Sequence, residues 1–216
     1  MDYFNFIKNI EINPTELCNL KCTFCPRADG YPNQNLHMNL ETAKEIRKNL
    51  DTVKFSKIVT FAGRGEPTLT QDFASIISIF IENNPTFYVD ITTNGKKIET
   101  LRSFFNNRLV SICFDVYDTD RKVFDEYVEK YSVFNNIRLV WKPDIGVKYD
   151  RILYDHIKKN KDKTSHDGRS VDGFTNRGGF LGDPVYDIED KGCAKLIYNL
   201  FIDWNGNYNL CCDDWN

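Results

Sequence analysis

Three cysteines lie within eight residues near the start of the printed sequence, in the segment TELCNLKCTFCPR (15–27). Cys18, Cys22 and Cys25 have the spacing C-x3-C-x2-C. A structural zinc site takes four tetrahedral ligands, commonly as two C-x2-C pairs, and an iron–sulfur cluster is ordinarily held by four thiolates. Three thiolates with no local fourth ligand, apart from His37, indicate a metal centre that keeps one coordination position open.

The segments that must position this loop alternate between strand-like and helix-like patterns. Strands are expected at 7–12, 57–63, 86–95, 108–118 and 135–143, and helices at 38–50 with Asn39 as N-cap, 72–84, 96–105, 120–131 and 149–160. A strand followed by a helix, repeated about five times at roughly 25-residue intervals, is typical of parallel βα units. The pattern predicts an α/β fold, either an open doubly wound sheet or a barrel. In both, ligands bind at the C-terminal ends of the strands.

The composition changes after this α/β region. Residues 161–184 are rich in Gly, Asp and Ser and predict a loop. Residues 195–212 predict a β-hairpin, because two apolar arms flank the turn Asn205-Gly206. The expected organisation is a core at 1–160, a connecting loop with the last elements of the α/β body at 161–192, and a hairpin at 193–216.

The overall composition excludes several classes of protein. The formal net charge of −3 and the pI near 5.7 argue against a nucleic-acid partner, which would favour a basic excess. No apolar run reaches the roughly 20 residues of a membrane span, and residues 1–13 lack the pattern of a signal peptide. We expect a cytoplasmic protein whose seven cysteines are metal ligands or buried thiols rather than disulfides.

The C-x3-C-x2-C loop after a first strand resembles the cysteine motif of radical S-adenosylmethionine (SAM) enzymes, and the resemblance covers most of the chain. Phe24 stands at the family's aromatic position before the third cysteine, where the backbone meets the adenine. The segment FAGRGEPTL (61–69) is similar to the family's GGEP segment, with Arg64 at a variable place. The matching residues are Gly63, Gly65, Glu66 and Pro67. The resemblance implies that this backbone and Glu66 hold the methionyl ammonium of SAM.

Three later strand ends extend the similarity. The segment TTNG looks like the family's strand end that contacts the ribose and the carboxylate, which implies SAM-binding roles for Thr93 and Asn94. Ser111 and Asp115 lie on the fourth strand, where family members contact the ribose. Lys142 ends the fifth strand and is expected where the substrate or the SAM carboxylate would lie.

The resemblance implies a [4Fe-4S] cluster on Cys18, Cys22 and Cys25, with one iron open to SAM. One electron would then cleave SAM to methionine and a 5′-deoxyadenosyl radical, which removes a hydrogen atom from the substrate. The protein orients these cofactors and keeps water away. A flavodoxin or ferredoxin is the implied reductant. The implied fold is a partial (β/α)6 barrel of TIM type with parallel strands, whose open side is closed by the short C-terminal β-hairpin.

The C-terminal segment adds a second, incomplete cysteine pattern. Cys193 and Cys211 fit C-x12-G-x4-C, which resembles the opening of a SPASM or twitch extension that carries auxiliary clusters. The later cysteines of the full pattern are absent from the printed sequence, so two buried thiols are the alternative. Cys212 and Asp213 stand where relatives carry a proton-accepting residue. Arg177, in FTNRGG, is a candidate for binding an anionic group of the substrate.

These features predict an oxidoreductase-type radical SAM enzyme that oxidises or rearranges a small polar metabolite such as a sugar or an aminocyclitol. The first cysteine is residue 18, which we expect to leave no room for a preceding leader-peptide-binding domain. Modification of a peptide or protein side chain is the alternative. Two other classes are alternatives: a non-catalytic iron–sulfur or zinc scaffold, and a SAM methyltransferase of polar mechanism. The GRGEP and TTNG segments oppose the scaffold, and the cysteine loop opposes the methyltransferase.

Overall fold

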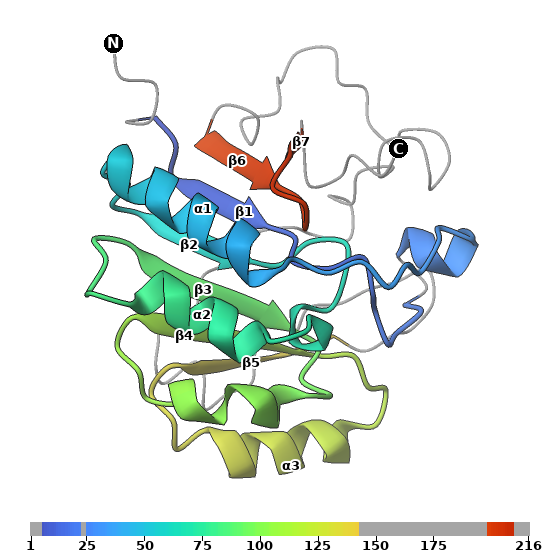
Figure 1. Cartoon of the computed structure of the whole chain (residues 1–216). Helices are drawn as coiled ribbons and strands as arrows, with labels where there is room; N and C mark the ends of the chain where they lie inside the picture. Colours follow the sequence, from blue (N-terminus) through green and yellow to red (C-terminus); the bar gives the residue numbers. More distant parts are fainter. Residues whose placement is uncertain (1–5, 23–24, 143–197, 210–216) are drawn as a thin grey trace, which may run out of the picture.

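A computed structural model of the chain describes residues 6–22, 25–142 and 198–209 (Figure 1). The strands are β1 (Asn9–Ile12), β2 (Ile58–Phe61), β3 (Tyr88–Thr93), β4 (Val110–Val116), β5 (Ile137–Trp141), β6 (Asn199–Ile202) and β7 (Tyr208–Asn209). The α-helices are α1 (Leu40–Thr52), α2 (Phe73–Ile81) and α3 (Arg121–Tyr131). The 3₁₀ helices are η2 (Pro26–Asp29), η3 (Pro67–Leu69) and η4 (Ile98–Phe104).

The described strands form one sheet in the order β5-β4-β3-β2-β1-β6-β7. Every neighbouring pair is parallel except β6 and β7, which are antiparallel. The sheet is not closed within the described residues, and its strands β1 to β5 follow one another in chain order, as in a partial barrel. The predicted α/β fold with parallel strands is therefore confirmed.

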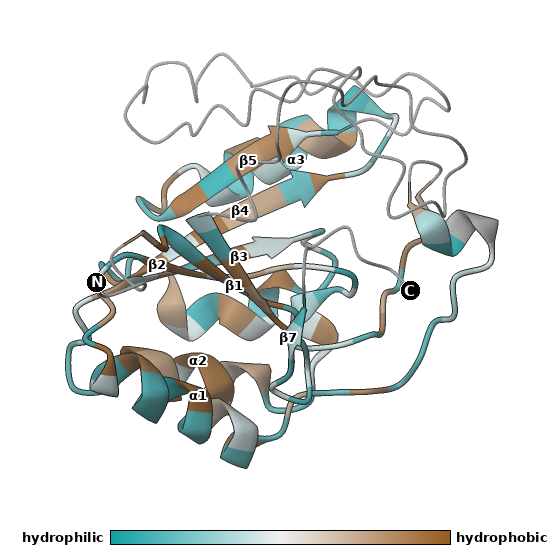
Figure 2. Cartoon of the chain, turned by 90° about the horizontal axis from the view of Figure 1, so that it is seen from above, coloured by the Kyte–Doolittle hydropathy of each residue, from teal (hydrophilic) through white to brown (hydrophobic). Residues whose placement is uncertain are grey.

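The hydrophobic core lies between the helices and one face of this sheet. Ile10, Val59 and Val89 occupy one register row and are fully buried. Helix α1 begins at the predicted N-cap Asn39, whose side chain accepts a hydrogen bond from the backbone N–H of Thr42. Figure 2 shows α1 and α2 on the same side of the sheet. Burying one such aliphatic side chain contributes about 1.5–3 kcal/mol, so this layer fixes the strand positions.

The C-terminal hairpin is part of the same sheet. Strand β6 pairs in parallel with β1, and β7 returns antiparallel to β6. The predicted turn Asn205-Gly206 lies between them, with Gly206 at φ 86°, a conformation that glycine adopts at little cost. The hairpin is confirmed for its described residues, and the structure adds that it extends the main sheet beyond β1.

Some predicted elements differ from the structure or cannot be compared with it. The helix expected at 96–105 is the 3₁₀ helix η4. The helix expected at 149–160, the last elements of the α/β body expected at 161–192 and the first residues of the hairpin lie outside the described residues.

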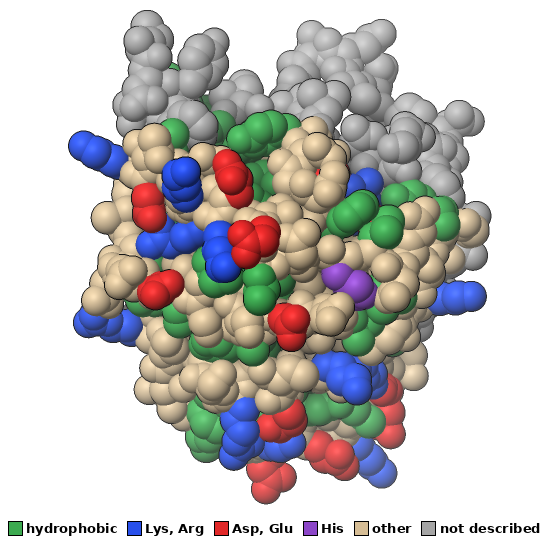
Figure 3. Space-filling model, viewed as in Figure 1, with side chains coloured by type: hydrophobic (Ala, Val, Ile, Leu, Met, Phe, Trp, Pro, Cys, Tyr) green, Lys and Arg blue, Asp and Glu red, His purple; other side chains and the backbone are tan. Residues whose placement is uncertain are grey.

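The helix side of the molecule carries interspersed charges of both signs (Figure 3). Exposed ion pairs join neighbouring turns within single helices, such as Lys44–Glu41 in α1 and Arg102–Glu99 in η4. This face therefore has no single-sign field of the kind that binds nucleic acid. Among the described residues, no helix is both long and apolar enough to cross a membrane.

Candidate functional site

The loops that follow β1, β2 and β3 meet at the C-terminal edge of the sheet. The Glu66 N–H donates to the carbonyl oxygen of Leu17 at 2.8 Å, which ties the GRGEP loop to the cysteine loop. The Asn94 side chain donates to Asn19 Oδ1 at 2.7 Å, which ties the end of β3 to the same loop. Three motifs that are far apart in the sequence therefore form one surface, as parallel strand ends allow.

None of the three cysteines is in a disulfide, and all three are partly exposed. The Cys25 N–H donates to the Cys22 carbonyl at 2.9 Å, and Asn33 holds the Cys18 backbone through its N–H (2.8 Å) and its carbonyl (2.9 Å). Burial raises the pKa of the Cys18 thiol. A cationic metal centre would offset this rise, because metal ligation deprotonates a thiol outright. Within the described ranges, no group of three or more His, Cys, Asp and Glu side chains is arranged to hold a metal ion. The assignment of these three thiols as cluster ligands therefore stays a prediction.

The only histidine near these cysteines in the sequence bonds to protein groups. His37 Nδ1 lies 2.9 Å from Thr15 Oγ1, and His37 Nε2 lies 2.8 Å from Asn35 Oδ1. Burial lowers the pKa of His37, so its neutral form is favoured. Its contacts hold the cysteine loop against the segment that leads into α1, where Thr15 and His37 form a β-bridge.

Two predicted glycines are required because neighbouring groups approach them closely. A Cβ atom at Gly65 would overlap the carbonyl oxygen of Thr15 and lie 2.9 Å from that of Leu17. A Cβ atom at Gly63 would lie 2.8 Å from the Asn13 side chain, and Gly63 has φ 116°. The glycines of the GRGEP loop therefore let it lie directly on the cysteine loop.

The carboxylate of Glu66 joins the ends of β2 and β3. Glu66 Oε1 accepts from the Thr68 N–H (3.1 Å), the Thr68 hydroxyl (2.6 Å) and the Thr93 hydroxyl (2.5 Å), and Oε2 accepts from the Asn94 N–H (2.7 Å). Burial raises the pKa of Glu66, and these hydrogen bonds oppose the rise. Glu66, Thr93 and Asn94 thus lie together, with Glu66 bound to protein donors, and their predicted contacts with SAM stay predictions.

Glu66→Gln should weaken this junction, because an amide NH₂ in place of Oε2 would face the Asn94 N–H. An unsatisfied buried donor costs about 1–3 kcal/mol. The Glu66 pKa is raised above its ordinary value of 4.5 in the folded chain, so folding favours the protonated form and this group's contribution to stability falls as pH rises from 4.5. Denaturant unfolding should show a larger gap between wild type and variant at pH 4.5 than at pH 8. A gap that widens toward pH 8 would contradict this account.

A buried charge cluster that the sequence did not reveal lies beneath the two loops. Glu16 Oε1 accepts from Asn13 Nδ2 (2.8 Å) and lies 3.1 Å from Arg64 Nη2, and Glu16 Oε2 lies 3.4 Å from Arg27 Nη2. Arg27 is 4% exposed and Glu16 is 5% exposed. Burial raises the pKa of Glu16, and Arg64 and Arg27 counter that effect. No spacing pattern marks these residues, since they are separated along the chain and meet only in the fold.

A second buried ion pair ends β4 and β5. Lys142 Nζ contacts Asp115 Oδ2, and both side chains are almost fully buried. The Tyr117 hydroxyl donates to the same oxygen at 3.3 Å, and the Cys113 thiol lies 3.6 Å from Asp115 Oδ1. Asp115 and Lys142 were predicted to contact SAM or the substrate, and the structure shows them paired with each other at the strand ends.

The sheet face opposite α1 and α2, here called the inner face, is polar. Glu11, Thr60, Asp90 and Ser111 form one register row across it. The Ser111 side chain hydrogen-bonds to Asp90. Burial raises the pKa of Asp90, and the nearby Arg138 and the Ser111 hydrogen bond only partly oppose this rise. Ser111 therefore bonds to Asp90 deeper on the inner face, while Asp115 lies further along the same strand.

The remaining predicted site residues lie outside the part of the chain that the structure describes. They are Phe24, Arg177, Cys193, Cys211, Cys212 and Asp213.

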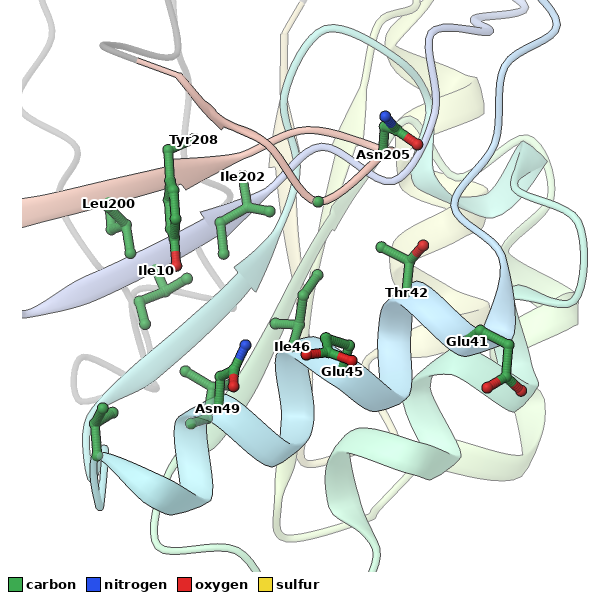
Figure 4. Close-up of a pocket in the computed structure, with 13 residues that line it drawn as sticks. Ile10, Glu41, Thr42, Glu45, Ile46, Asn49, Leu200, Ile202, Asn205 and Tyr208 are labelled. Carbon is green, nitrogen blue, oxygen red and sulfur yellow. The ribbon is translucent and has the colours of Figure 1, made fainter.

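A separate groove of about 370 Å³ lies between α1 and the β6–β7 hairpin (Figure 4). Leu200, Ile202 and Tyr208 line it from the hairpin, and Ile46 and Asn49 line it from α1. No predicted site residue lines this groove. It is therefore distinct from the strand-end site.

Comparison with known proteins gives a family match and structural neighbours. Residues 12–140 match the family model described as Radical SAM superfamily. The crystal structure of BtrN in complex with AdoMet and 2-DOIA superimposes with a TM-score of 0.65 at 18% identity, covering 97% of this chain and 75% of BtrN. Streptococcus suis SuiB bound to precursor peptide SuiA gives a TM-score of 0.61 at 15% identity, covering 96% of this chain and 60% of SuiB.

At these identities the two structures show a shared fold, and the family match carries the assignment. It spans the cysteine loop, the GRGEP and TTNG segments and the end of β4. Members of the family use a [4Fe-4S] cluster and SAM and cleave SAM by radical chemistry. Since the match extends over more than half of the 216 residues, the chain belongs to the radical SAM superfamily.

Proposed function

We propose that the chain uses radical SAM chemistry to oxidise or rearrange a small polar metabolite, such as a sugar or an aminocyclitol, bound on the inner face of the sheet. The observation that carries this proposal is the polar row on that face, which includes Asp90 and Ser111, together with the nearby Arg138, which lies opposite Cys113, two residues beyond Ser111 along β4. BtrN, crystallised with AdoMet and 2-DOIA, supports the same choice of substrate class.

The polar row is unusual for the interior of a barrel-type fold. Such interiors are normally filled by layers of Val, Ile and Leu. Here a carboxylate, a hydroxyl and a guanidinium lie on three adjacent strands, with acceptor and donor groups close together. A few placed polar groups give a small-molecule site its specificity. A ligand with several hydroxyl or amino groups matches this set.

The strand-end residues have separate roles in this proposal. Cys18, Cys22 and Cys25 would hold the [4Fe-4S] cluster, and the GRGEP loop, with Glu66 and Asn94, would shape the SAM pocket. When bound, these cofactors supply a 5′-deoxyadenosyl radical that abstracts a hydrogen atom from the substrate. The loops position the reacting groups and exclude water, which would otherwise compete for reactive intermediates.

The ion pair of Asp115 and Lys142 joins the ends of β4 and β5. The pair, together with the Tyr117 hydroxyl, offers donors and an acceptor to the ribose or to the substrate. Cys212 and Asp213 remain our candidates for accepting a proton from the substrate, and Arg177 for binding an anionic group of it. Phe24 remains the proposed adenine contact.

The proposal also includes the setting of the reaction. A flavodoxin or ferredoxin in the cytoplasm would supply the electron. Cys193 and Cys211 are proposed as the start of a SPASM or twitch-like segment at 193–216, following the connecting segment 161–192. The adjacent Cys211 and Cys212 do not comfortably reach one cluster together, so we propose a single complete cluster for this chain.

Modification of a peptide side chain is the second candidate. SuiB, which was crystallised with the precursor peptide SuiA, shares the fold over 96% of this chain. The open edge of the described sheet would admit an extended peptide. Both candidates use the same strand-end site and differ only in what occupies the inner face.

The test is an anaerobic assay with reconstituted chain, dithionite and SAM. We expect 5′-deoxyadenosine without substrate at a low rate, and a higher rate when 2-DOIA or a related amino sugar is added. With deuterated substrate, deuterium should appear in 5′-deoxyadenosine. Stimulation by a peptide alone, with none by any polyol or amino sugar, would select the second candidate.

Arg138→Met provides the control for where the substrate binds. It removes the charge but keeps an unbranched side chain of similar reach. We expect it to raise the KM of the stimulating substrate by about tenfold, the value of one lost charged hydrogen bond. Cleavage of SAM without substrate should fall much less. Equal losses in both assays would argue against a substrate site on the inner face.

A further inference from the structure

We infer that Arg27 is a positioning residue that sets the GRGEP loop against the cysteine loop and so couples cluster binding to SAM binding. The positioning role follows from the contacts of Arg27. Its effect on SAM binding rests on the proposed function. The residue immediately follows the Cys25-Pro26 segment and belongs to none of the recognised motifs.

Arg27 bonds to three separate segments of backbone. Its Nη2 donates to the carbonyl of Glu16 at 2.7 Å, and its Nη1 donates to the carbonyl of Pro32 at 2.5 Å. Its Nε and Nη2 donate to the carbonyl of Arg64 at 3.1 and 3.0 Å. One guanidinium thus joins both sides of the cysteine loop to the centre of the GRGEP loop.

The surroundings of Arg27 compensate its buried charge. The Glu16 carboxylate lies 3.4 Å from Nη2, and the Tyr31 ring lies 5.2 Å from the guanidinium carbon. A stacked, paired and hydrogen-bonded guanidinium is the form in which arginine tolerates burial. The planar fork is needed because its donors point in fixed, different directions, which the single ammonium of lysine cannot reproduce.

The carbonyl of Arg64 lies at the functional part of the loop. The next two residues are Gly65, which lies on the cysteine-loop backbone, and Glu66, whose N–H bonds to Leu17. Holding the Arg64 carbonyl therefore fixes the backbone proposed to bind the methionyl group, at a set separation from the cysteines. Misplacing a reacting group by about 1 Å can cost on the order of a hundredfold in rate.

Hydrogen exchange on the full chain, before cluster reconstitution, tests the mechanical half of the inference. Arg27→Lys should increase exchange of the Gly65 and Glu66 amides by about tenfold, the effect of losing a charged hydrogen bond. Amides in the middle of β4 should be unchanged. Faster exchange confined to residues 14–18 would show that Arg27 serves only its own loop, and would overturn the inference.

SAM binding to the reconstituted chain tests the functional half. Arg27→Lys should keep about four irons per chain while lowering SAM affinity by about tenfold and weakening the SAM-induced change in the electron paramagnetic resonance spectrum of the reduced cluster. The matched control is Arg102→Lys, an exposed arginine paired with Glu99, which should change neither quantity.

Three outcomes separate the possibilities. Unchanged SAM affinity in Arg27→Lys with normal exchange at Gly65 and Glu66 overturns the inference. Iron loss in Arg27→Lys with unchanged exchange at those two amides also overturns it, because Arg27 would then act only on cluster retention. A wild-type chain that takes up no cluster would defeat the proposed function, while the exchange experiment would still decide the role of Arg27.

Discussion

Cys18→Ala is expected to abolish both cluster assembly and 5′-deoxyadenosine formation. A [4Fe-4S] cluster that already leaves one iron for SAM would retain two thiolates, whereas such clusters ordinarily rest on four ligands. Iron content should fall from about four atoms per chain toward zero, and dithionite with SAM should give no 5′-deoxyadenosine above background. Cys22→Ala and Cys25→Ala should behave alike, because the three thiols lie on one loop.

Cys113→Ala is the matched control for these variants. Cys113 is also a free cysteine, but it is buried on β4 beside Asp115. Its loss should leave the iron content at the wild-type value. If Cys18→Ala kept full iron content and cleaved SAM at the wild-type rate, the assignment of the cluster to this loop would be wrong.

Gly65→Ala is the second variant with a large expected effect. The added methyl group would overlap the Thr15 carbonyl oxygen, so the GRGEP loop would have to move away from the cysteine loop. Overpacking strain of about 1–3 kcal/mol and the loss of the Glu66–Leu17 hydrogen bond, about 1 kcal/mol, combine to about 2–4 kcal/mol. We expect SAM affinity to fall by roughly 30-fold or more, measured by equilibrium binding to the reconstituted chain.

Gly206→Ala separates this local effect from a general loss of stability. Gly206 has φ 86° in the hairpin turn, so alanine is strained there, yet the residue lies far along the chain from the cysteine loop and lines the separate groove. It should lower the unfolding midpoint while SAM affinity stays near the wild-type value. If Gly65→Ala and Gly206→Ala lost SAM affinity equally, the close contact between the GRGEP and cysteine loops would not explain the effect of Gly65→Ala.

Much of the fold was predictable because its elements are set by local patterns. The strands β1 to β5 and the helices α1 to α3 were predicted from apolar periodicity, and Asn39 from its preference for the N-cap position. Segment 96–105 was the exception. Its helical composition was read correctly, but its hydrogen bonds follow the tighter 3₁₀ pattern, a distinction that side-chain periodicity over one or two turns does not encode.

The hairpin shows a different limit of sequence reasoning. Asn205-Gly206 predicted the turn, because an Asn-Gly pair favours the backbone geometry of a tight hairpin turn. The pairing of β6 with β1 was not predictable in this way. It joins residues almost two hundred positions apart, and strand pairing at that separation depends on which sheet edge is left open by all the other elements.

Motif spacing along the chain predicted the residues of the candidate site: three thiols at fixed spacing, the glycines and glutamate of GRGEP, and Asn94 at a strand end. These residues follow from motif spacing, since each motif lies within one loop. The groups that these residues contact became evident only in the folded chain. Four of these contacts join different loops or strands: Arg27 with Arg64, Glu66 with Thr93, Asp115 with Lys142, and Ser111 with Asp90. The physical reason is that buried charges and donors take the partner that the packed backbone places within reach, and that partner leaves no periodic trace in the chain.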